Sequence, residues 1–336
     1  MNKFGQILRV ILPVRIRKIG GKISRRIELK KLYRLDLNRF SKSAINLVSN
    51  MDAINLRSSI TMGYHGIEKG FCKPKFRFGF GKNAIQSLGV YLLEYYNKGY
   101  NMQDQRVKTA IGVLEKYCEI HEGKSEYLNS VKSILDSIHV PKSAQNVGLK
   151  QYDREKIINS VKSDFQSLAL NRMSVRDYGE EVVDKNLIEE ALQIAMKTPS
   201  VCNRQTWMVH LITDSILLKR VLEIQGGFSG NGANLSNVIL VTTNAKYFSG
   251  SIERNQGYID GGIYLMSVVY ALTYKGMATC ILNAAFDYKR EKEIRVLLGI
   301  DESELLIGFV TIGNYPGKFK CPVSVRDSYD EHLIIH

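Results

Sequence analysis

The stretch from Tyr258 to Tyr274 restricts the possible folds of this chain more than any other. It has the length of a helix, and its apolar residues fall on nearly every side, namely Ile259, Ile263, Leu265, Met266, Val268, Val269 and Leu272. A helix that has no polar face must be covered on all sides. From these residues alone, we expect a central core helix in a monomer.

A short segment before this helix carries charged and polar residues at alternate positions. Arg172, Ser174 and Arg176 are each two residues apart. In an extended chain such residues point to the same side. Arginine offers a fork of charged donors and serine a short donor, so this side suits a phosphate.

A second polar segment, Pro199 to Trp207, follows a predicted helix that Asp184 caps and that runs to about Lys197. Its amide side chains, Asn203 and Gln205, can donate to and accept from the edge of a heterocycle. We expect Trp207 to pack in the core at the start of a strand.

Four motifs in this order resemble the nitroreductase family of flavin enzymes. They are Arg-x-Ser-x-Arg (172–176), Pro-Ser-x-x-Asn-x-Gln-x-Trp (199–207), Asp-Gly-Gly (260–262) before the apolar helix, and Gly-x-Tyr-Pro (313–316). The chain departs at Thr206, where the family usually has Pro, and at Met173, where Arg or His is common. Neither change removes a proposed ligand. The resemblance runs from about Phe165 to Arg326.

This resemblance implies an FMN site. The implied cofactor-binding residues are Arg172, Ser174, Arg176, Asn203, Gln205, Thr279, Cys280, Ile281 and Arg326. The arginines and the serine would hold the phosphate and ribityl side, and the two amides would contact the ring edge or the ribityl hydroxyls. The strand through Cys280 would run beside the flavin ring and supply a backbone N–H near its N5 atom. Arg326 has an alternative interpretation as an exposed arginine in a tail.

The activity implied by the resemblance is hydride transfer from NAD(P)H, through flavin N5, to a small electron acceptor in a ping-pong cycle. The flavin carries the chemistry, so we assign no catalytic side chain and no metal ligand. Two alternatives remain: a flavin-dependent dehydrogenase or oxidase in a biosynthetic pathway, and a non-catalytic membrane-associated scaffold. The family also implies a homodimer, with the Tyr258–Tyr274 helix at its interface.

For residues 151–336 the order of predicted elements does not form a simple parallel series, so we expect an α+β fold. It would be nitroreductase-like, with a mixed central sheet flanked by helices. We expect helices at about 153–170, 215–224 and 287–298, and strands at 207–213, 238–243, 276–282 and 305–312, the last being the final strand. Residues 36–150 are expected to form a mainly helical N-terminal region, with helices at about 83–98, 103–121 and 125–138.

The net charge of +14 is concentrated in residues 1–35, which hold eleven Lys and Arg and one acidic residue, Glu28. Phe4, Ile7, Leu8, Ile11 and Leu12 have helical spacing within this arm. A basic amphipathic helix can lie on an anionic membrane surface, or it can pack on its own protein. We expect a cytoplasmic protein, peripheral at the inner membrane face if the arm binds lipid, and no nucleic-acid partner because the arm lacks interleaved aromatic residues.

The stretch Gly63 to Phe71 contains His65, Glu68 and Lys69 between glycines. We interpret it as a turn with a local ion pair, with a binding or catalytic loop as the alternative. A similar His-x-Ile-Glu-Lys-Gly stretch precedes the flavin domain in some nitroreductase-like proteins associated with polysaccharide biosynthesis. The five cysteines include no Cys-x-x-Cys pair and are expected to be free thiols.

Overall fold

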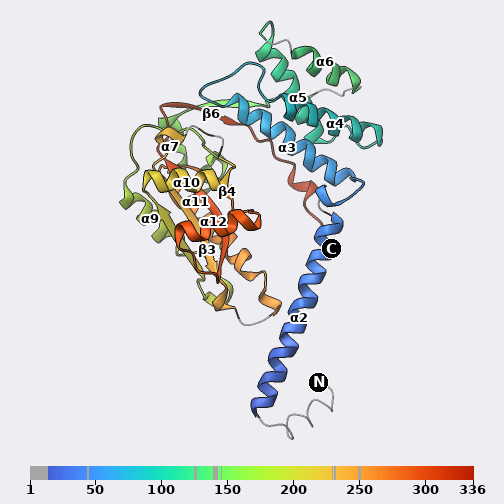
Figure 1. Ribbon diagram of the computed structural model, residues 1–336. Helices are drawn as coiled ribbons and strands as arrows, with labels where there is room; N and C mark the ends of the chain where they lie inside the picture. Colours follow the sequence, from blue (N-terminus) through green and yellow to red (C-terminus); the bar gives the residue numbers. More distant parts are fainter. Residues whose placement is uncertain are drawn as a thin grey trace.

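A computed structural model gives the structure of residues 14–43, 45–124, 127–138, 143–144, 146–228, 230, 232–248 and 251–336. The N-terminal region consists of α2 (Val14–Ser43), α3 (Ala53–Phe71), α4 (Lys82–Asn97), α5 (Gln105–His121) and α6 (Leu128–Ser137). Helices α3 to α6 pack together around one apolar core, and α2 extends away from them along the rest of the molecule (Figure 1). The predicted mainly helical N-terminal region is confirmed.

Residues 63–71 were predicted to form a turn, and this prediction is wrong because they continue α3 to its end. The glycines serve close packing instead. A Cβ atom on Gly70 would lie 2.0 Å from Cε2 of Phe80, and one on Gly63 would lie 3.2 Å from the side chain of Leu88. Asp52 caps the helix through the backbone N–H of Asn55, which fixes its start.

The two glycines Gly66 and Gly70 allow a matched stability test on this helix. No heavy atom lies within 4 Å of a Cβ built on Gly66, so Gly66→Ala is expected to raise the free energy of unfolding by about 0.5–1 kcal/mol. Gly70→Ala forces a methyl group into the ring of Phe80 and is expected to lower it by about 1–3 kcal/mol. Urea unfolding of both variants checks this, and shifts of the same sign would contradict the close packing at Gly70.

A two-stranded antiparallel sheet follows the helical region. Its strands are β1 (Leu149–Asp153) and β6 (Lys318–Pro322), with Leu149 opposite Pro322. The strands come from distant parts of the chain, and β6 lies against α3. The predicted final strand, 305–312, is therefore not the last one. The ring of Tyr152 stacks on that of Phe319, at a centroid distance of 5.7 Å, and joins the two strands on one side.

The main sheet has the strand order β2-β3-β5-β4, formed by β2 (Trp207–Ile212), β3 (Asn237–Asn244), β5 (Glu304–Gly313) and β4 (Ala278–Asn283). The α+β class is confirmed, but all three pairings are antiparallel, so the expected mixed sheet is not found among the described strands. The pairing of Ile212 with Val238 gives the reason. The chain leaves β2 and re-enters β3 at the same end of the sheet, after an excursion through α10 (Ser215–Gln225).

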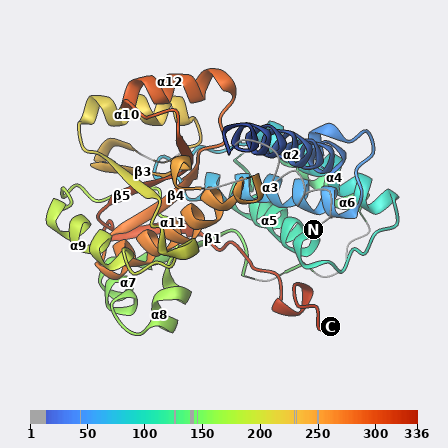
Figure 2. The ribbon, with the colours of Figure 1, turned by 90° about the horizontal axis from the view of Figure 1, so that it is seen from below.

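Helices cover both faces of this sheet (Figure 2). One face carries α10 and α12 (Tyr288–Leu298), and the other carries α9 (Lys185–Ala195) and α11 (Gln256–Tyr274), while α7 (Arg154–Val161) and α8 (Phe165–Asn171) lie against α11. In β3, Val238 and Leu240 point into the first core, whereas Ile239 and Val241 point into the second. Neighbouring side chains of this buried strand point to opposite faces of the sheet, so the sheet is the middle of three layers, with helices above and below it.

Several predicted boundaries are confirmed by caps. Asp184, Asp214 and Asp287 each accept a hydrogen bond from a backbone N–H in the first turn of α9, α10 and α12. The helix predicted from Asp153 to about Leu170 is instead two helices, because Asp164 caps a new start at Phe165. Trp207 is buried as predicted and stacks on Tyr264, with ring centroids 4.4 Å apart.

Helix α11 confirms the predicted Tyr258–Tyr274 helix, but it is buried on one side only. Tyr264, Val268, Val269 and Leu272 are buried. On the other side the exposed fractions of Tyr258, Ile259 and Ile263 are 53%, 53% and 45%. The expectation of a core helix covered all round in a monomer is therefore wrong, since part of this apolar surface is open in the single chain.

The basic arm is described only from Val14 onward, and Phe4 to Leu12 lie outside the described residues. Within α2, Glu28 accepts a hydrogen bond from Ser251 at 2.7 Å, and Asp36 pairs with Arg254 at 2.8 Å. This part of α2 thus contacts its own protein. No helix among the described residues is both long and apolar enough to cross a bilayer.

Candidate functional site

The predicted phosphate-binding segment opens onto a cavity of about 650 Å³ between the helical region and the sheet region. One wall is formed by residues 169–174 and Arg176, and a second by residues 321–326 after β6. Helix α3 contributes Thr61, Tyr64, His65 and Glu68, and α11 contributes Met266 and Tyr270. This volume is within the usual range for small-molecule sites.

The alternation predicted for residues 172–176 has a clear structural origin. The side chains of Met173 and Val175 pack into the core of the sheet region. The backbone N–H of Val175 donates to the carbonyl of Thr279 on the edge strand β4, at 2.9 Å. Because neighbouring side chains of an extended segment point to opposite sides, Arg172, Ser174 and Arg176 are directed to the cavity, which all three line.

Arg172, Arg176 and Arg326 come together at the cavity although the third lies 150 residues away in the chain. Among the described residues, none of their guanidinium groups pairs with a carboxylate. Arg176 donates to the carbonyl of Ser174 at 3.3 Å, and Arg326 donates to that of Ser324. Three such groups directed to one cavity create a site for an anion that accepts several hydrogen bonds.

A smaller hollow on the other side of Arg176 adds to this positive charge. Lys69, Lys73 and Lys320 line it together with Ser174 and Arg176. Burial lowers the pKa of Lys69, and the charge of Arg176 lowers it further. Asp177 also lines this hollow, so four cations face one carboxylate. The net positive charge favours an anionic ligand, because a cleft concentrates ligands of the opposite sign.

The helical region supplies an acidic group to the same cavity. Glu68 is fully buried and its Oε2 atom lies 3.4 Å from Nδ1 of His65, which confirms the predicted local pair. Its other oxygen, Oε1, has no hydrogen-bond partner among the described residues. The charge of Glu68 also contributes, after burial, to raising the pKa of the Cys72 thiol to about 12.

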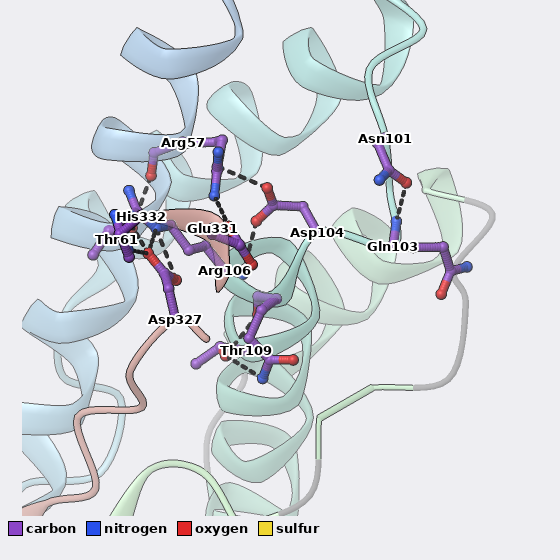
Figure 3. A network of polar contacts seen from close by, with 11 residues as sticks. Arg57, Thr61, Asn101, Gln103, Asp104, Arg106, Thr109, Asp327, Glu331 and His332 are labelled. Carbon is purple, nitrogen blue, oxygen red and sulfur yellow. Dashed lines mark hydrogen bonds and ion pairs between the residues drawn. The ribbon is translucent and has the colours of Figure 1, made fainter. Parts of the chain in front are cut away.

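A cluster of ion pairs fixes the C-terminal segment that carries Arg326 (Figure 3). Asp327, the next residue, accepts hydrogen bonds from Nε and Nη2 of Arg106 on α5. Arg57 on α3 pairs with Asp104 at 2.7 Å and with Glu331 at 2.9 Å. The segment therefore runs from β6 along α3 and is held against the helical region (Figure 1).

The pairing of Arg106 with Asp327 is strong because both groups are partly removed from water. The side chain of Asp327 is 11% exposed and that of Arg106 is 27% exposed. Hydrogen bonds from Arg106 lower the pKa of Asp327 and, in return, the pKa of Arg106 is raised. Arg326 is attached to this fixed point, which limits where its guanidinium group can lie.

Thr279, Cys280 and Ile281 lie on β4, beside the Arg172–Arg176 segment, but are not among the described residues that line the cavity. Thr279 and Cys280 are buried, whereas Ile281 is 37% exposed. Burial raises the pKa of the Cys280 thiol, and the nearby charge of Arg176 opposes this effect. The thiol is therefore protonated at neutral pH.

Asn203 and Gln205 are not brought to the cavity in the single chain. Both are exposed, and Nε2 of Gln205 donates to Oδ1 of Asn203 at 3.2 Å. Their segment is tied to the N-terminal half of α11, because the backbone N–H of Val201 donates to the carboxylate of Asp260 at 3.3 Å. The cavity lies by Met266 and Tyr270 of the same helix.

Sequence reasoning missed Tyr152, Arg106 and Asp327, and it interpreted Glu68 as part of a local ion pair, with a binding or catalytic loop only as the alternative. Tyr152 and Glu68 line the cavity, and the other two residues fix the segment of Arg326. The only local signal was the spacing of His65 and Glu68, which places both on one side of a helix once residues 63–71 are known to be helical.

Comparisons with known proteins find a similarity in the region that contains Arg172 and Arg176. Residues 169–229 match the model of the Nitroreductase family. A protein of Archaeoglobus fulgidus named "Putative NADH dehydrogenase/NAD(P)H nitroreductase" is 28% identical over 145 residues, which are 43% of this chain and 81% of that protein.

Two solved structures show the extent of the structural similarity. An FMN-dependent nitroreductase of Clostridium difficile R20291 has 19% identity and a TM-score of 0.38, covering 43% of this chain and 83% of its own. A nitroreductase family protein of Streptococcus pneumoniae TIGR4 has 19% identity and a TM-score of 0.42, covering 52% of this chain and 100% of its own. None of these four descriptions mentions polysaccharide biosynthesis.

Proposed function

The second half of this chain belongs to the nitroreductase family of oxidoreductases, and on that premise we propose that the protein is an FMN-dependent NAD(P)H oxidoreductase acting on a small electron acceptor. The observation that carries the proposal is the convergence of Arg172, Arg176 and Arg326 on one cavity with Ser174, where none of the three arginines pairs with a carboxylate of the described residues. Glu68 is a further ligand candidate there, because its Oε1 atom has no hydrogen-bond partner within the part of the chain that the structure describes.

The residues present fit the phosphate of FMN. A phosphate dianion needs several charged donors in fixed positions, and arginine forks meet this need better than lysines do. The cavity also offers the hydroxyl of Ser174 and the hydroxyl of Tyr152 on its wall. When bound, FMN supplies hydride transfer. The chain's own part is to bind and orient the cofactor.

Each predicted ligand has a separate proposed task. Arg172, Ser174 and Arg176 bind the phosphate from the sheet side, and Arg326 binds it from the C-terminal segment. The pairing of Asp327 with Arg106 holds the backbone next to Arg326 before binding, which lowers the entropy cost of placing this arginine. Thr279, Cys280 and Ile281 would form the strand beside the ring, with backbone groups as the donors.

We also propose a homodimer through α11. Ile259 and Ile263 lie four residues apart on the exposed side of α11, and Met266 and Tyr270 follow at intervals of three and four residues, partly buried against the core. Tyr258, Ile259 and Ile263 are about half exposed in the single chain. An apolar helix face of this kind is suited to a self-complementary contact with a second copy about a two-fold axis.

The dimer explains why Asn203 and Gln205 lie away from the arginines. Their segment is attached at Asp260, whereas Tyr270 lies at the cavity, ten residues or about 15 Å further along α11. If two α11 helices pack antiparallel, the beginning of one helix meets the end of the other. The partner's Asn203 and the partner's Gln205 would then approach the cavity of the first subunit.

The first test is a visible absorption spectrum of the purified full chain, followed by mass identification of whatever it releases on denaturation. Oxidised flavin bands and released FMN are the expected result. Anaerobic addition of NADH and of NADPH then tests the direction of the reaction, since bleaching of the flavin bands supports the reductase and its absence favours a biosynthetic dehydrogenase. A colourless protein that does not take up added FMN would refute the proposal.

A further inference from the structure

The helical region places a buried carboxylate against the proposed FMN site. Glu68 is 0% exposed and lines the cavity, yet one of its two oxygens has no hydrogen-bond partner among the described residues. The other has only a long contact of 3.4 Å with His65. Thr61 and Tyr64 lie on the same side of α3 and also line the cavity.

Such a group needs an explanation, because buried polar atoms in native proteins are nearly always paired. Burying a carboxylate without a full set of partners is costly. The arginines that face the same cavity do not supply the missing partner, since none pairs with Glu68 at salt-bridge distance. The missing donor must therefore come from outside the described residues, on a bound ligand or on an ordered water.

We propose that Glu68 is a ligand-binding residue of the FMN site, supplied by the helical region, and that its Oε1 atom accepts a hydrogen bond from a hydroxyl of the ribityl chain. The inference rests on the proposed function. His65 is a positioning residue that holds the carboxylate through its Oε2 atom.

The charged groups that line the cavity restrict the chemical class of the ligand. The arginines require an anion, and a carboxylate close to that anion requires a donor such as a hydroxyl. A polyol phosphate carries both groups a few bonds apart, and the ribityl phosphate of FMN is one. The helical region would then bind the cofactor directly rather than only cover the sheet region, which ties residues 53–71 to the activity.

Three flavins separate the contacts. FMN has the ribityl chain and the phosphate, riboflavin lacks the phosphate, and lumiflavin lacks both. Dissociation constants of the three are measured for the wild-type full chain, Glu68→Ala, Arg172→Ala and the control Glu119→Ala. Glu119 also lies in the helical region, but its side chain is 68% exposed and pairs with Lys116.

Glu68→Ala is expected to raise the dissociation constants of FMN and riboflavin by the same factor, about tenfold or more. The dissociation constant of lumiflavin should not change. Arg172→Ala is expected to raise the dissociation constant of FMN alone. Glu119→Ala is expected to leave all three dissociation constants unchanged. The melting temperature of the flavin-free Glu68→Ala protein should be unchanged or higher, because a poorly paired buried carboxylate is removed. A purely structural Glu68 would instead lower it.

The outcomes distinguish this inference from the proposed function. If the wild-type protein binds none of the three flavins, the proposed function fails and the inference fails with it. If the wild type binds FMN and Glu68→Ala binds it equally well, only the inference is overturned. The inference is also overturned if Glu68→Ala weakens the binding of lumiflavin as much as that of FMN, because the contact would then not involve the ribityl chain.

Discussion

Replacing both Arg172 and Arg176 with alanine is expected to raise the dissociation constant for FMN by about two to four orders of magnitude. A hydrogen bond that involves a charged group contributes about 1.5–3 kcal/mol, and each 1.4 kcal/mol corresponds to about a factor of ten. The double variant loses two such groups from the cavity. Fluorescence titration of the flavin-free protein with FMN measures the change, and the purified variant should be colourless.

The fold of this double variant should persist, which makes the loss specific. The two side chains are half-buried and unpaired among the described residues, so their removal leaves no carboxylate without a partner and relieves repulsion between like charges. Arg220→Ala is a matched control, because that arginine is 53% exposed and pairs with Glu293 away from the cavity. Unchanged FMN affinity in the double variant would refute the assignment of the phosphate site.

Ile263→Arg is expected to convert the dimer into a monomer and to weaken FMN binding at the same time. A charge placed at the centre of an apolar two-fold contact meets its own copy and must be desolvated there, which costs several kcal/mol per dimer. The site then also loses the amides that the second subunit would supply. Sedimentation velocity reports the assembly state, and titration with FMN reports the site.

The exposure of Ile263 makes this variant informative. Its side chain is 45% exposed in the single chain, and substitutions at exposed positions usually change stability by less than about 0.5 kcal/mol. A monomer that is as stable as the wild-type subunit would therefore place the effect at the interface. Ile216→Arg, on the 80% exposed residue of α10, serves as the control. A wild-type protein that is already monomeric would refute the dimer.

Local sequence patterns were sufficient to predict those features that depend only on residues within the same helix or strand. The aspartates before α9 and α12 predicted the starts of these helices, because a cap depends on residues two or three positions away. The alternation of Arg172, Ser174 and Arg176 likewise predicted a shared side, since Met173 and Val175 are apolar and pack into the core.

Local patterns misled where a residue serves a distant neighbour. Glycines at 63, 66 and 70 suggested a turn, but Gly70 in fact admits the ring of Phe80 from outside the helix. The apolar helix α11 suggested a fully covered core, although one of its sides is open in the single chain. Spacing alone does not tell whether a neighbour lies in the same chain or in a second copy.

The sequence by itself determined the class of fold, several of the helix starts and the side of the segment that carries the phosphate donors. The helix starts and the shared side depend on contacts within a few residues. The tertiary structure decided which segments share the cavity. Glu68 and Arg176 lie more than a hundred residues apart in the chain, and Arg106 meets Asp327 across 221 residues. Such contacts arise when apolar faces pack and exclude water, so they depend on the whole core and not on any local spacing.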